Sequence, residues 1–214
     1  MDFWGFMVRN HEQVLVLMRQ HLELTFLSVG IAALVAYPLG LAATRLSALG
    51  RVVTPLANVG QTLPSIAVLA LVIPFLGIGF TPALLALTLR AFLPIYLNSY
   101  VGIRSVDPAL VDAARGLGFN DFQVLFRVEV PVASPVILAG IKTAAVQNVA
   151  IATLAAFIGG GGLGDLILQG LALVDAPRLL AGAVPTALLA VTLEVLGGWI
   201  ERLLTPRGLT LNTS

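Results

Sequence analysis

The stretch VVTPLANVGQTLPSIAVLALVIPFLGIGFTPALLALTL, residues 52–89, contains no charged side chain. A helix needs about 20 mostly apolar residues to cross the roughly 30 Å of hydrocarbon in a bilayer, so this stretch is too long for one crossing. The sequence Gly-Ile-Gly at 77–79, followed by Pro82, supplies a natural break. The stretch therefore predicts an integral membrane protein with spans near residues 54–76 and 82–103.

The composition of the whole chain agrees with this prediction. Hydrophobic residues make up 58% of the 214 residues and charged residues 11%, against roughly a quarter in typical soluble chains. The mean hydropathy is +0.97, which excludes a soluble or a disordered chain. The net charge of +1 gives no basic surface for nucleic acid. With no Cys and only His11 and His21, we expect neither a metal site nor a cofactor.

Three further apolar runs complete a set of five predicted spans, near residues 24–44, 132–158 and 181–203. The first twenty residues mix apolar and charged groups and predict an amphipathic helix at the membrane interface. Residues 159–180 predict an external loop with a short helix, because their apolar piece, 166–174, is too short to span. The predicted fold is an all-α membrane protein with a single domain over residues 1–214.

Positive charges set the predicted orientation, because loops rich in Lys and Arg stay in the cytoplasm. With five spans, seven arginines share one side: Arg45, Arg51, Arg104, Arg115, Arg127, Arg202 and Arg207. Three lie on the other: Arg9, Arg19 and Arg178. The N-terminus is therefore expected outside and the C-terminus in the cytoplasm.

The one long cytoplasmic loop is residues 104–131. Asp107-Pro108 predicts a helix start, with Asp at the N-cap and Pro at the first helical position. That helix is expected to end at Gly116 or Gly118. Asn120 or Asp121 can cap a second helix with an apolar face of Phe122, Leu125 and Phe126. A merely solvated connector would need neither the small Ala113-Ala114 pair nor exposed aromatic residues.

This loop resembles the cytoplasmic signature of the permease subunits of bacterial ATP-binding cassette importers. The residues that carry the resemblance are Asp112-Ala113-Ala114, then Gly118, then Val128-x-Val130-Pro131. The signature usually has Glu where Asp112 stands, and Ile and Leu where the two valines stand. These exchanges keep charge and shape.

Further segments are similar to one branch of that family, the permeases of the type I importers for osmoprotectants such as glycine betaine, carnitine and choline. The matching segments are Gln61-Thr62-Leu63-Pro64-Ser65, Leu93-Pro94-Ile95, Asn98-Ser99-Tyr100-x-Gly102-Ile103, Ala155-Ala156-Phe157-Ile158-Gly159-x-Gly161-Gly162-Leu163-Gly164-Asp165 and Leu203-Leu204-Thr205-Pro206-Arg207-Gly208-Leu209. With the loop they cover about residues 22–209.

The resemblance implies a division of labour in the bacterial inner membrane. Two permease subunits, identical or different, surround a pathway; an extracytoplasmic solute-binding protein delivers the solute, and ATP-binding cassette ATPase subunits receive the cytoplasmic loop. Ala113, Ala114 and Gly118 would allow close approach to the ATPase, and Asp112 and Arg115 could make charged contacts. This chain has no phosphate-binding Gly-rich loop with Lys and Ser or Thr, so hydrolysis is assigned to a separate polypeptide and the chain is not an enzyme.

Two polar patches within the spans are candidates for lining the pathway. Asn58, Gln61, Thr62 and Ser65 have offsets of 0, 3, 4 and 7, which would place them on one face of a helix kinked at Pro64. Gln147 and Asn148 form a second patch in the fourth span. The alternative for both patches is interhelical hydrogen bonding.

Three ionisable residues lie deepest within the spans: Arg90, Lys142 and Glu194. Charges inside a membrane are usually paired or face a cavity, so Glu194 could neutralise Arg90 or Lys142. In the alternative, Lys142 and Glu194 extend to the cytoplasmic interface without pairing.

Three other functions compete with osmoprotectant import. The first is an importer of the same class with an amino acid or a sulfonate as its cargo. The second is an ion-coupled secondary transporter, which the long loop and the lack of an obvious inverted repeat disfavour. The third is a membrane-embedded enzyme, for which no nucleophile–base or metal constellation is present.

Overall fold

The computed structural model describes residues 2–204, which fold into helices and contain no strand. This confirms the predicted all-α fold. In chain order the elements are α1 (Phe3–Arg9), α2 (His11–Arg45), α3 (Ser47–Thr62), α4 (Ser65–Leu76), α5 (Phe80–Arg104), α6 (Pro108–Gly116), α7 (Asp121–Val124), the π-helical turn η1 (Leu125–Glu129), α8 (Val130–Ala152), the 3₁₀ helix η2 (Thr153–Ile158), α9 (Gly164–Ala172) and α10 (Ala176–Leu204).

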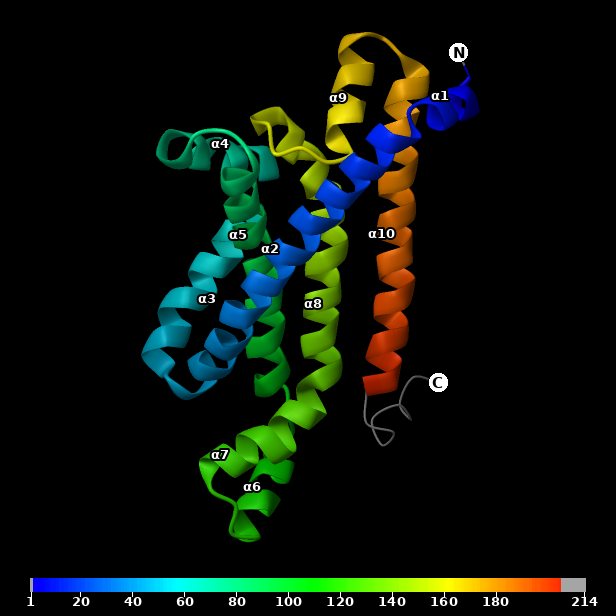
Figure 1. The fold of residues 1–214 in the computed structure, drawn as a ribbon. Helices are drawn as coiled ribbons and strands as arrows, with labels where there is room; N and C mark the ends of the chain where they lie inside the picture. Colours follow the sequence, from blue (N-terminus) through cyan, green and yellow to red (C-terminus); the bar gives the residue numbers. More distant parts are fainter. Residues whose placement is uncertain (1, 205–214) are drawn as a thin grey trace.

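Four long helices form the bundle in Figure 1: α2, α5, α8 and α10. Each is long and apolar enough to cross a membrane, with α8 extended at both ends by the helical segments that adjoin it. The α3–α4 pair makes a fifth crossing if it is taken as one broken span. The helices lie where the apolar runs predict them, within about five residues at each end apart from the starts of α2 and α3. Which of them cross the bilayer, and in which direction, stays a prediction.

Small residues let the central helices approach closely. A Cβ added at Gly40 of α2 would come within 2.7 Å of the Ser99 side chain on α5, and one at Gly140 of α8 within 2.5 Å of Asn98. Close backbone approach through Gly and Ala is how helices associate in lipid, where no hydrophobic driving force acts between them. The α2–α5 and α5–α8 contacts therefore hold the centre of the bundle together.

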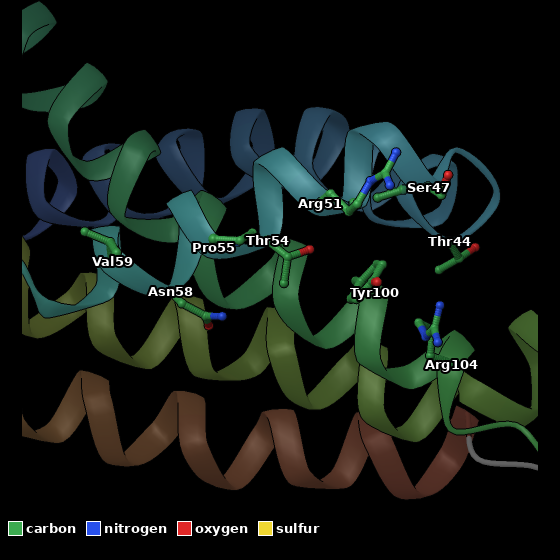
Figure 2. A pocket seen from close by; sticks show the side chains of 11 residues that line it. Thr44, Ser47, Arg51, Thr54, Pro55, Asn58, Val59, Tyr100 and Arg104 are labelled. Carbon is green, nitrogen blue, oxygen red and sulfur yellow. The ribbon is translucent and has the colours of Figure 1, made fainter.

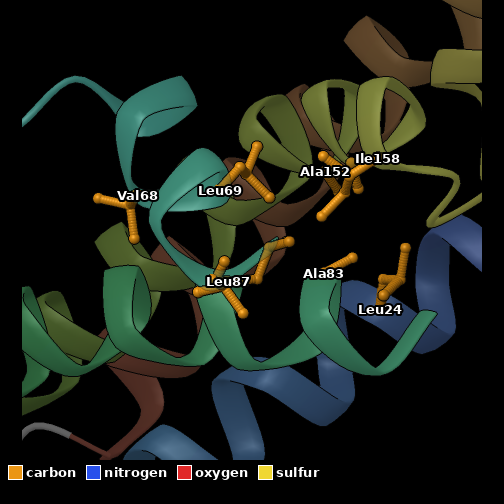
Figure 3. Close-up of a cluster of buried hydrophobic side chains, with 10 residues drawn as sticks. Leu24, Val68, Leu69, Ala83, Leu87, Ala152 and Ile158 are labelled. Atoms are coloured by element: carbon orange, nitrogen blue, oxygen red, sulfur yellow. The ribbon is translucent and has the colours of Figure 1, made fainter. Parts of the chain in front are cut away.

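A buried apolar cluster joins this centre to the broken span (Figure 3). Leu69 of α4 and Leu87 of α5 are buried in it together with Leu24 of α2. The end of the fourth predicted span adds Ala152 and Ile158. The cluster fixes α4 against α2, α5 and η2.

The second predicted span, 54–76, is not one kinked helix. Its two parts, α3 and α4, meet at an angle of 107° around Leu63 and Pro64. The bend leaves carbonyl groups at the end of α3 without α-helical partners, although the Leu63 amide donates to the Gly60 carbonyl at 3.3 Å. The Arg90 guanidinium of α5 donates to two carbonyls at the bend, those of Gly60 at 3.3 Å and of Leu63 at 3.2 Å. Arg90 thus caps the bend.

The N-terminal segment also differs from its prediction. Only α1 is a separate helix, because residues 11–20 continue directly into the first long helix, α2. Phe6, Val14 and Leu17 are buried against Leu163 and Leu166 of the 159–180 segment. The amphipathic pattern of the first twenty residues reflects this packing inside the protein, and their position at the membrane interface stays a prediction.

Candidate functional site

A helical arm projects from one end of the bundle (Figure 1). We call residues 104–131, which contain α6, α7 and η1, the projecting arm. The Asp107 side chain accepts a hydrogen bond from the Ala109 amide at 2.8 Å, with Pro108 as the first helical residue. Asn120 and Gln123 form a reciprocal capping box that starts α7. The predicted cap at Asp107 is confirmed, and of the two candidates for the second cap the structure selects Asn120.

The turn between the two arm helices depends on Gly118. Its φ of +87° lies in a region that L-residues with a side chain avoid. A Cβ there would meet no atom within 4 Å, so backbone conformation and not crowding within the chain requires the glycine. The turn therefore sets the angle between α6 and α7.

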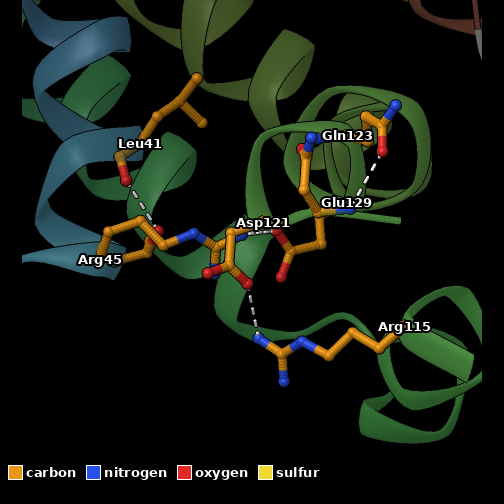
Figure 4. A network of polar contacts seen from close by, with 8 residues as sticks. Leu41, Arg45, Arg115, Asp121, Gln123 and Glu129 are labelled. Atoms are coloured by element: carbon orange, nitrogen blue, oxygen red, sulfur yellow. Dashed lines mark hydrogen bonds and ion pairs between the residues drawn. The ribbon is translucent and has the colours of Figure 1, made fainter. Parts of the chain in front are cut away.

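The residues expected to contact an ATPase fall into two groups. Asp112, Ala113, Arg115 and Gly118 are exposed on the arm. Ala114 is buried within this subunit, so it does not itself form exposed surface, and its role in the approach of an ATPase stays a prediction. Its small side chain lets α6 pack on the rest of the arm. Arg115 is held by an ion pair with Asp121 at 3.1 Å, which links the two arm helices (Figure 4).

The arm also carries exposed apolar side chains. Phe122 is 70% exposed, and its ring lies 4.6 Å from that of Phe126 between centroids. Leu110 and Leu117 are exposed as well. Apolar groups clustered on a polar projection outside the bundle are typical of a protein-binding surface.

An ion pair at the base of the arm was not predicted from sequence. Glu129, the last residue of η1, accepts a hydrogen bond from the guanidinium of Arg45, the last residue of α2 (Figure 4). Only 6% of the Glu129 side chain is exposed, against 37% of that of Arg45. The two residues are 84 positions apart, so no local pattern could have revealed the pair. It ties the arm to the first long helix.

The first polar patch divides at the bend. Asn58, Gln61 and Thr62 are exposed on α3. Ser65 belongs to α4, beyond the 107° turn, so it does not share their helix face and the predicted set of four is wrong in this member.

The polar face of α3 instead continues toward the other end of the helix. Ser47, Arg51, Thr54 and Asn58 have offsets of 0, 4, 7 and 11, and Thr62 follows at 15, so all lie on one face. We call this row the polar stripe. It faces a cavity of about 670 Å³ between α3, α5 and the end of α2 (Figure 2). The residues lining the cavity are Ala43, Thr44, Ser47, Gly50, Arg51, Thr54, Pro55, Asn58, Val59, Tyr100 and Arg104.

The second polar patch is also divided. Gln147 is exposed, whereas Asn148 is 1% exposed inside the bundle. The Asn148 amide donates to the Ser28 hydroxyl of α2 at 2.9 Å and to the Leu87 carbonyl of α5 at 3.1 Å. This corrects the assignment of Asn148 to the pathway: it joins three helices by the interhelical bonds that were the alternative.

The three intramembrane charges have different partners. Lys142 of α8 pairs with Glu194 of α10 at 3.1 Å and with Glu201 at 3.4 Å. Of the two partners considered for Glu194, the structure therefore selects Lys142. Among residues 2–204, Arg90 pairs with no acidic side chain and bonds to carbonyls at the bend.

The membrane-length helices, the polar stripe and the projecting arm together define the transmembrane subunit of a transporter. Residues 36–207 match the family described as binding-protein-dependent transport system inner membrane component. The chain belongs to this family.

Relatives of known name cover almost the whole chain. It is 42% identical over 204 residues to the carnitine transport permease protein OpuCB of Listeria monocytogenes, covering 95% of this chain and 94% of the relative. It is 41% identical to the choline transport system permease protein OpuBB of Bacillus subtilis, again covering 95% of this chain and 94% of the relative. It is 40% identical over 214 residues to the osmoprotectant import permease protein OsmW of Salmonella typhimurium, with 98% and 100% covered.

Solved structures share the fold. An inward-facing conformation of the MetNI methionine ABC transporter matches with a TM-score of 0.82 at 24% identity, covering 90% of this chain and 96% of that chain. An amino acid ABC transporter with histidines matches with a TM-score of 0.73 at 21% identity, covering 94% and 98%. These likenesses confirm the type I importer permease fold.

Proposed function

We propose that this chain is the transmembrane subunit of an ATP-driven importer for a small zwitterionic or quaternary-ammonium solute, an osmoprotectant such as glycine betaine, carnitine or choline. One observation carries the proposal: identity of 40–42% over at least 94% of both chains to permeases named for carnitine, choline and osmoprotectants. Similarity of that extent covers the pathway helices and the arm together.

The arm is the proposed coupling element. Its exposed apolar residues, with Asp112 and Arg115 beside them, suit a groove on a separate ATPase subunit. Closure of the ATPase pair would move the arm as one body, since α6 packs against α7 and η1. The Arg45–Glu129 pair would pass that motion to α2.

The arginine distribution supports the proposed orientation in the inner membrane. The arm and the Leu204 end of α10 lie at one end of the bundle, and the N-terminus and α9 at the other (Figure 1). The end rich in arginine would be cytoplasmic. A solute-binding protein would then dock at the end that carries α4 and α9.

A second permease subunit is part of the proposal. Asn58, Gln61 and Thr62 are exposed in a single subunit at a depth where lipid would leave their polar groups without partners. A second subunit facing this surface would enclose the stripe in a water-filled pathway.

Reconstitution tests the proposal. The permease is purified together with an ATPase subunit of the same organism, placed in vesicles with a solute-binding protein, and assayed for ATP-dependent uptake of glycine betaine, carnitine and choline. Uptake that needs both ATP and the binding protein is expected. Uptake of methionine or an aliphatic sulfonate in their place would contradict the cargo and leave the class intact. Uptake driven by an ion gradient without ATP would contradict the class.

A further inference from the structure

The cavity beside the polar stripe has an unusual charge pattern. Arg51 reaches it from α3 and Arg104 from α5, on either side of Tyr100 in Figure 2. Its lining, drawn entirely from residues that the structure describes, contains no Asp or Glu. The cavity therefore holds two positive charges and no compensating negative charge of its own.

Neither arginine is committed to another partner. Within residues 2–204, Arg51 and Arg104 form no ion pair and no hydrogen bond through their side chains; Arg104 only lies over the Tyr100 ring, at 5.9 Å from its centroid. Nearby cations are engaged differently, since Arg45 pairs with Glu129 and Arg115 with Asp121. Two free guanidinium groups at one cavity favour an anionic ligand.

Other groups in the cavity suit a small carboxylate. Ser47 and Thr54 offer hydroxyl groups, and the Thr54 hydroxyl is positioned by a 2.9 Å hydrogen bond with the Tyr96 hydroxyl, whereas the Thr44 hydroxyl already donates to the Leu41 carbonyl. A volume of about 670 Å³ accommodates a solute of the size of a betaine with water around it.

The position of the cavity distinguishes a solute from a lipid. The polar stripe lines the cavity from Ser47 to Asn58 and continues to Thr62 near the bend, so the cavity lies along the polar face of α3. The exposed apolar residues Val52 and Leu56 lie on a separate face of α3, at offsets of 0 and 4. Acyl chains would cover that apolar face, whereas the polar stripe suits a solute in water.

We propose that this cavity is an inner solute subsite, in which Arg51 and Arg104 hold the carboxylate of a zwitterionic solute during its passage. The transporter would then carry a carboxylate-bearing solute in preference to a cation of similar size, which gains nothing from two arginines. This inference rests on the proposed function, because it takes the polar stripe as the pathway.

The test compares glycine betaine, which carries a carboxylate, with choline, which is a cation. Uptake rates are measured in vesicles containing the complete transporter, at saturating solute-loaded binding protein, so that selection by the binding protein does not set the ratio. Arg51→Gln and Arg104→Gln are each expected to lower the glycine betaine to choline ratio about tenfold, the loss typical of one charge-assisted hydrogen bond. Arg51→Lys and Arg104→Lys keep the charge and are expected to retain most of the ratio.

Arg202→Gln is the matched control. It removes an exposed arginine of the same predicted side that lies outside the cavity, and no change in the ratio is expected. An unchanged ratio in both cavity Gln variants, or an equal fall for both solutes, would overturn the subsite. A wild type that carries choline but no zwitterion would overturn it too. If the wild type carries glycine betaine but not choline, an equal fall in the glycine betaine uptake rate in the Gln and Lys variants would overturn the subsite.

Two further results separate the remaining explanations. A wild type that imports neither solute contradicts the proposed function itself. The assay is repeated in vesicles of phosphatidylcholine alone and of phosphatidylcholine mixed with phosphatidylglycerol. An effect of the Gln variants that requires phosphatidylglycerol would assign the cavity to a lipid headgroup and overturn the solute subsite.

Discussion

Arg45 and Glu129 form an ion pair that connects the end of α2 to the base of the projecting arm (Figure 4). Glu129 is nearly buried, and its carboxylate accepts a hydrogen bond from Arg45, which belongs to a helix distant in sequence. No other ion pair among the described residues links the arm to the bundle, because the second pair in the arm, Arg115–Asp121, is internal to it.

Reversing one charge of this pair is expected to destabilise the protein. Arg45→Glu or Glu129→Arg leaves a partly buried charge without its partner, which costs about 1–3 kcal/mol in the free energy of unfolding. Thermal unfolding of the purified protein measures the loss. The double variant, which restores the pair in reverse, is expected to recover part of the stability and of the ATP-dependent uptake.

The exposed pair in the same arm is the control for that experiment. Arg115→Asp is expected to change the free energy of unfolding by about 0.5 kcal/mol or less, because exposed pairs contribute little. Equal effects at Arg45 and Arg115, or a double variant no better than the sum of its two changes, would mean that the Arg45–Glu129 contact carries no coupling energy.

Substituting Gly118 tests the turn in the arm. Gly118→Ala forces a side chain into a left-handed conformation, at a cost of about 1–2 kcal/mol. Because the turn sets the angle between α6 and α7, we expect weaker co-purification with the ATPase. Gly116→Ala is the matched control: Gly116 has open space and ends the α6 helix, so this change is expected to be neutral or slightly stabilising. Identical behaviour of the two variants would contradict a conformational role for Gly118.

Two neighbouring residues in α8 are expected to differ in their effect on stability. Asn148→Ala removes two interhelical hydrogen bonds and should lower stability by roughly 1 kcal/mol, the scale of such bonds in membranes. Gln147→Ala changes an exposed side chain and should leave thermal unfolding unaltered. If Gln147 lines the pathway, its substitution lowers uptake without loss of folded protein. A stability loss at Gln147 equal to that at Asn148 would contradict this division.

Lys142 has two acidic partners, so losing one should be tolerated. Glu194→Gln is expected to leave the yield of folded protein almost unchanged, since Glu194 is half exposed and Glu201 remains. The double change Glu194→Gln and Glu201→Gln leaves Lys142 uncompensated between α8 and α10, and a clear fall in yield is expected. Glu12→Gln, at an exposed position of α2, is the control. A large loss from Glu194→Gln alone would show that the two acids do not share the lysine.

Local chemistry explains which parts of the fold could be predicted. The cap at Asp107 can be predicted from sequence, and the second cap can be narrowed to Asn120 or Asp121, because a cap is made by the side chain and the backbone of its own turn. The long helices were predicted because a membrane demands a minimum apolar length. Both signals lie within one segment of sequence.

Long-range contacts explain the rest. Pro64 is compatible with a kink or with a full bend, and the 107° angle is stabilised by Arg90, which lies in another helix. The sequence does not show whether an amide side chain in an apolar run faces water or another helix, so the buried Asn148 could not be distinguished from the exposed Gln147. The burial of Ala114 could not be predicted for the same reason, because a small residue allows close packing on either side of a helix.

The π-helical turn η1 determines the direction in which the arm points. A π-turn holds about one residue more than an α-turn, and each residue of an α-helix rotates the next by roughly 100°. Deleting one residue between 125 and 129 would leave both adjoining helices intact but shift their register. Phe122 and the rest of the arm would then be rotated around the α8 axis, away from any partner fitted to the present orientation. The number of residues in this turn, rather than their identity, therefore determines the direction of the arm.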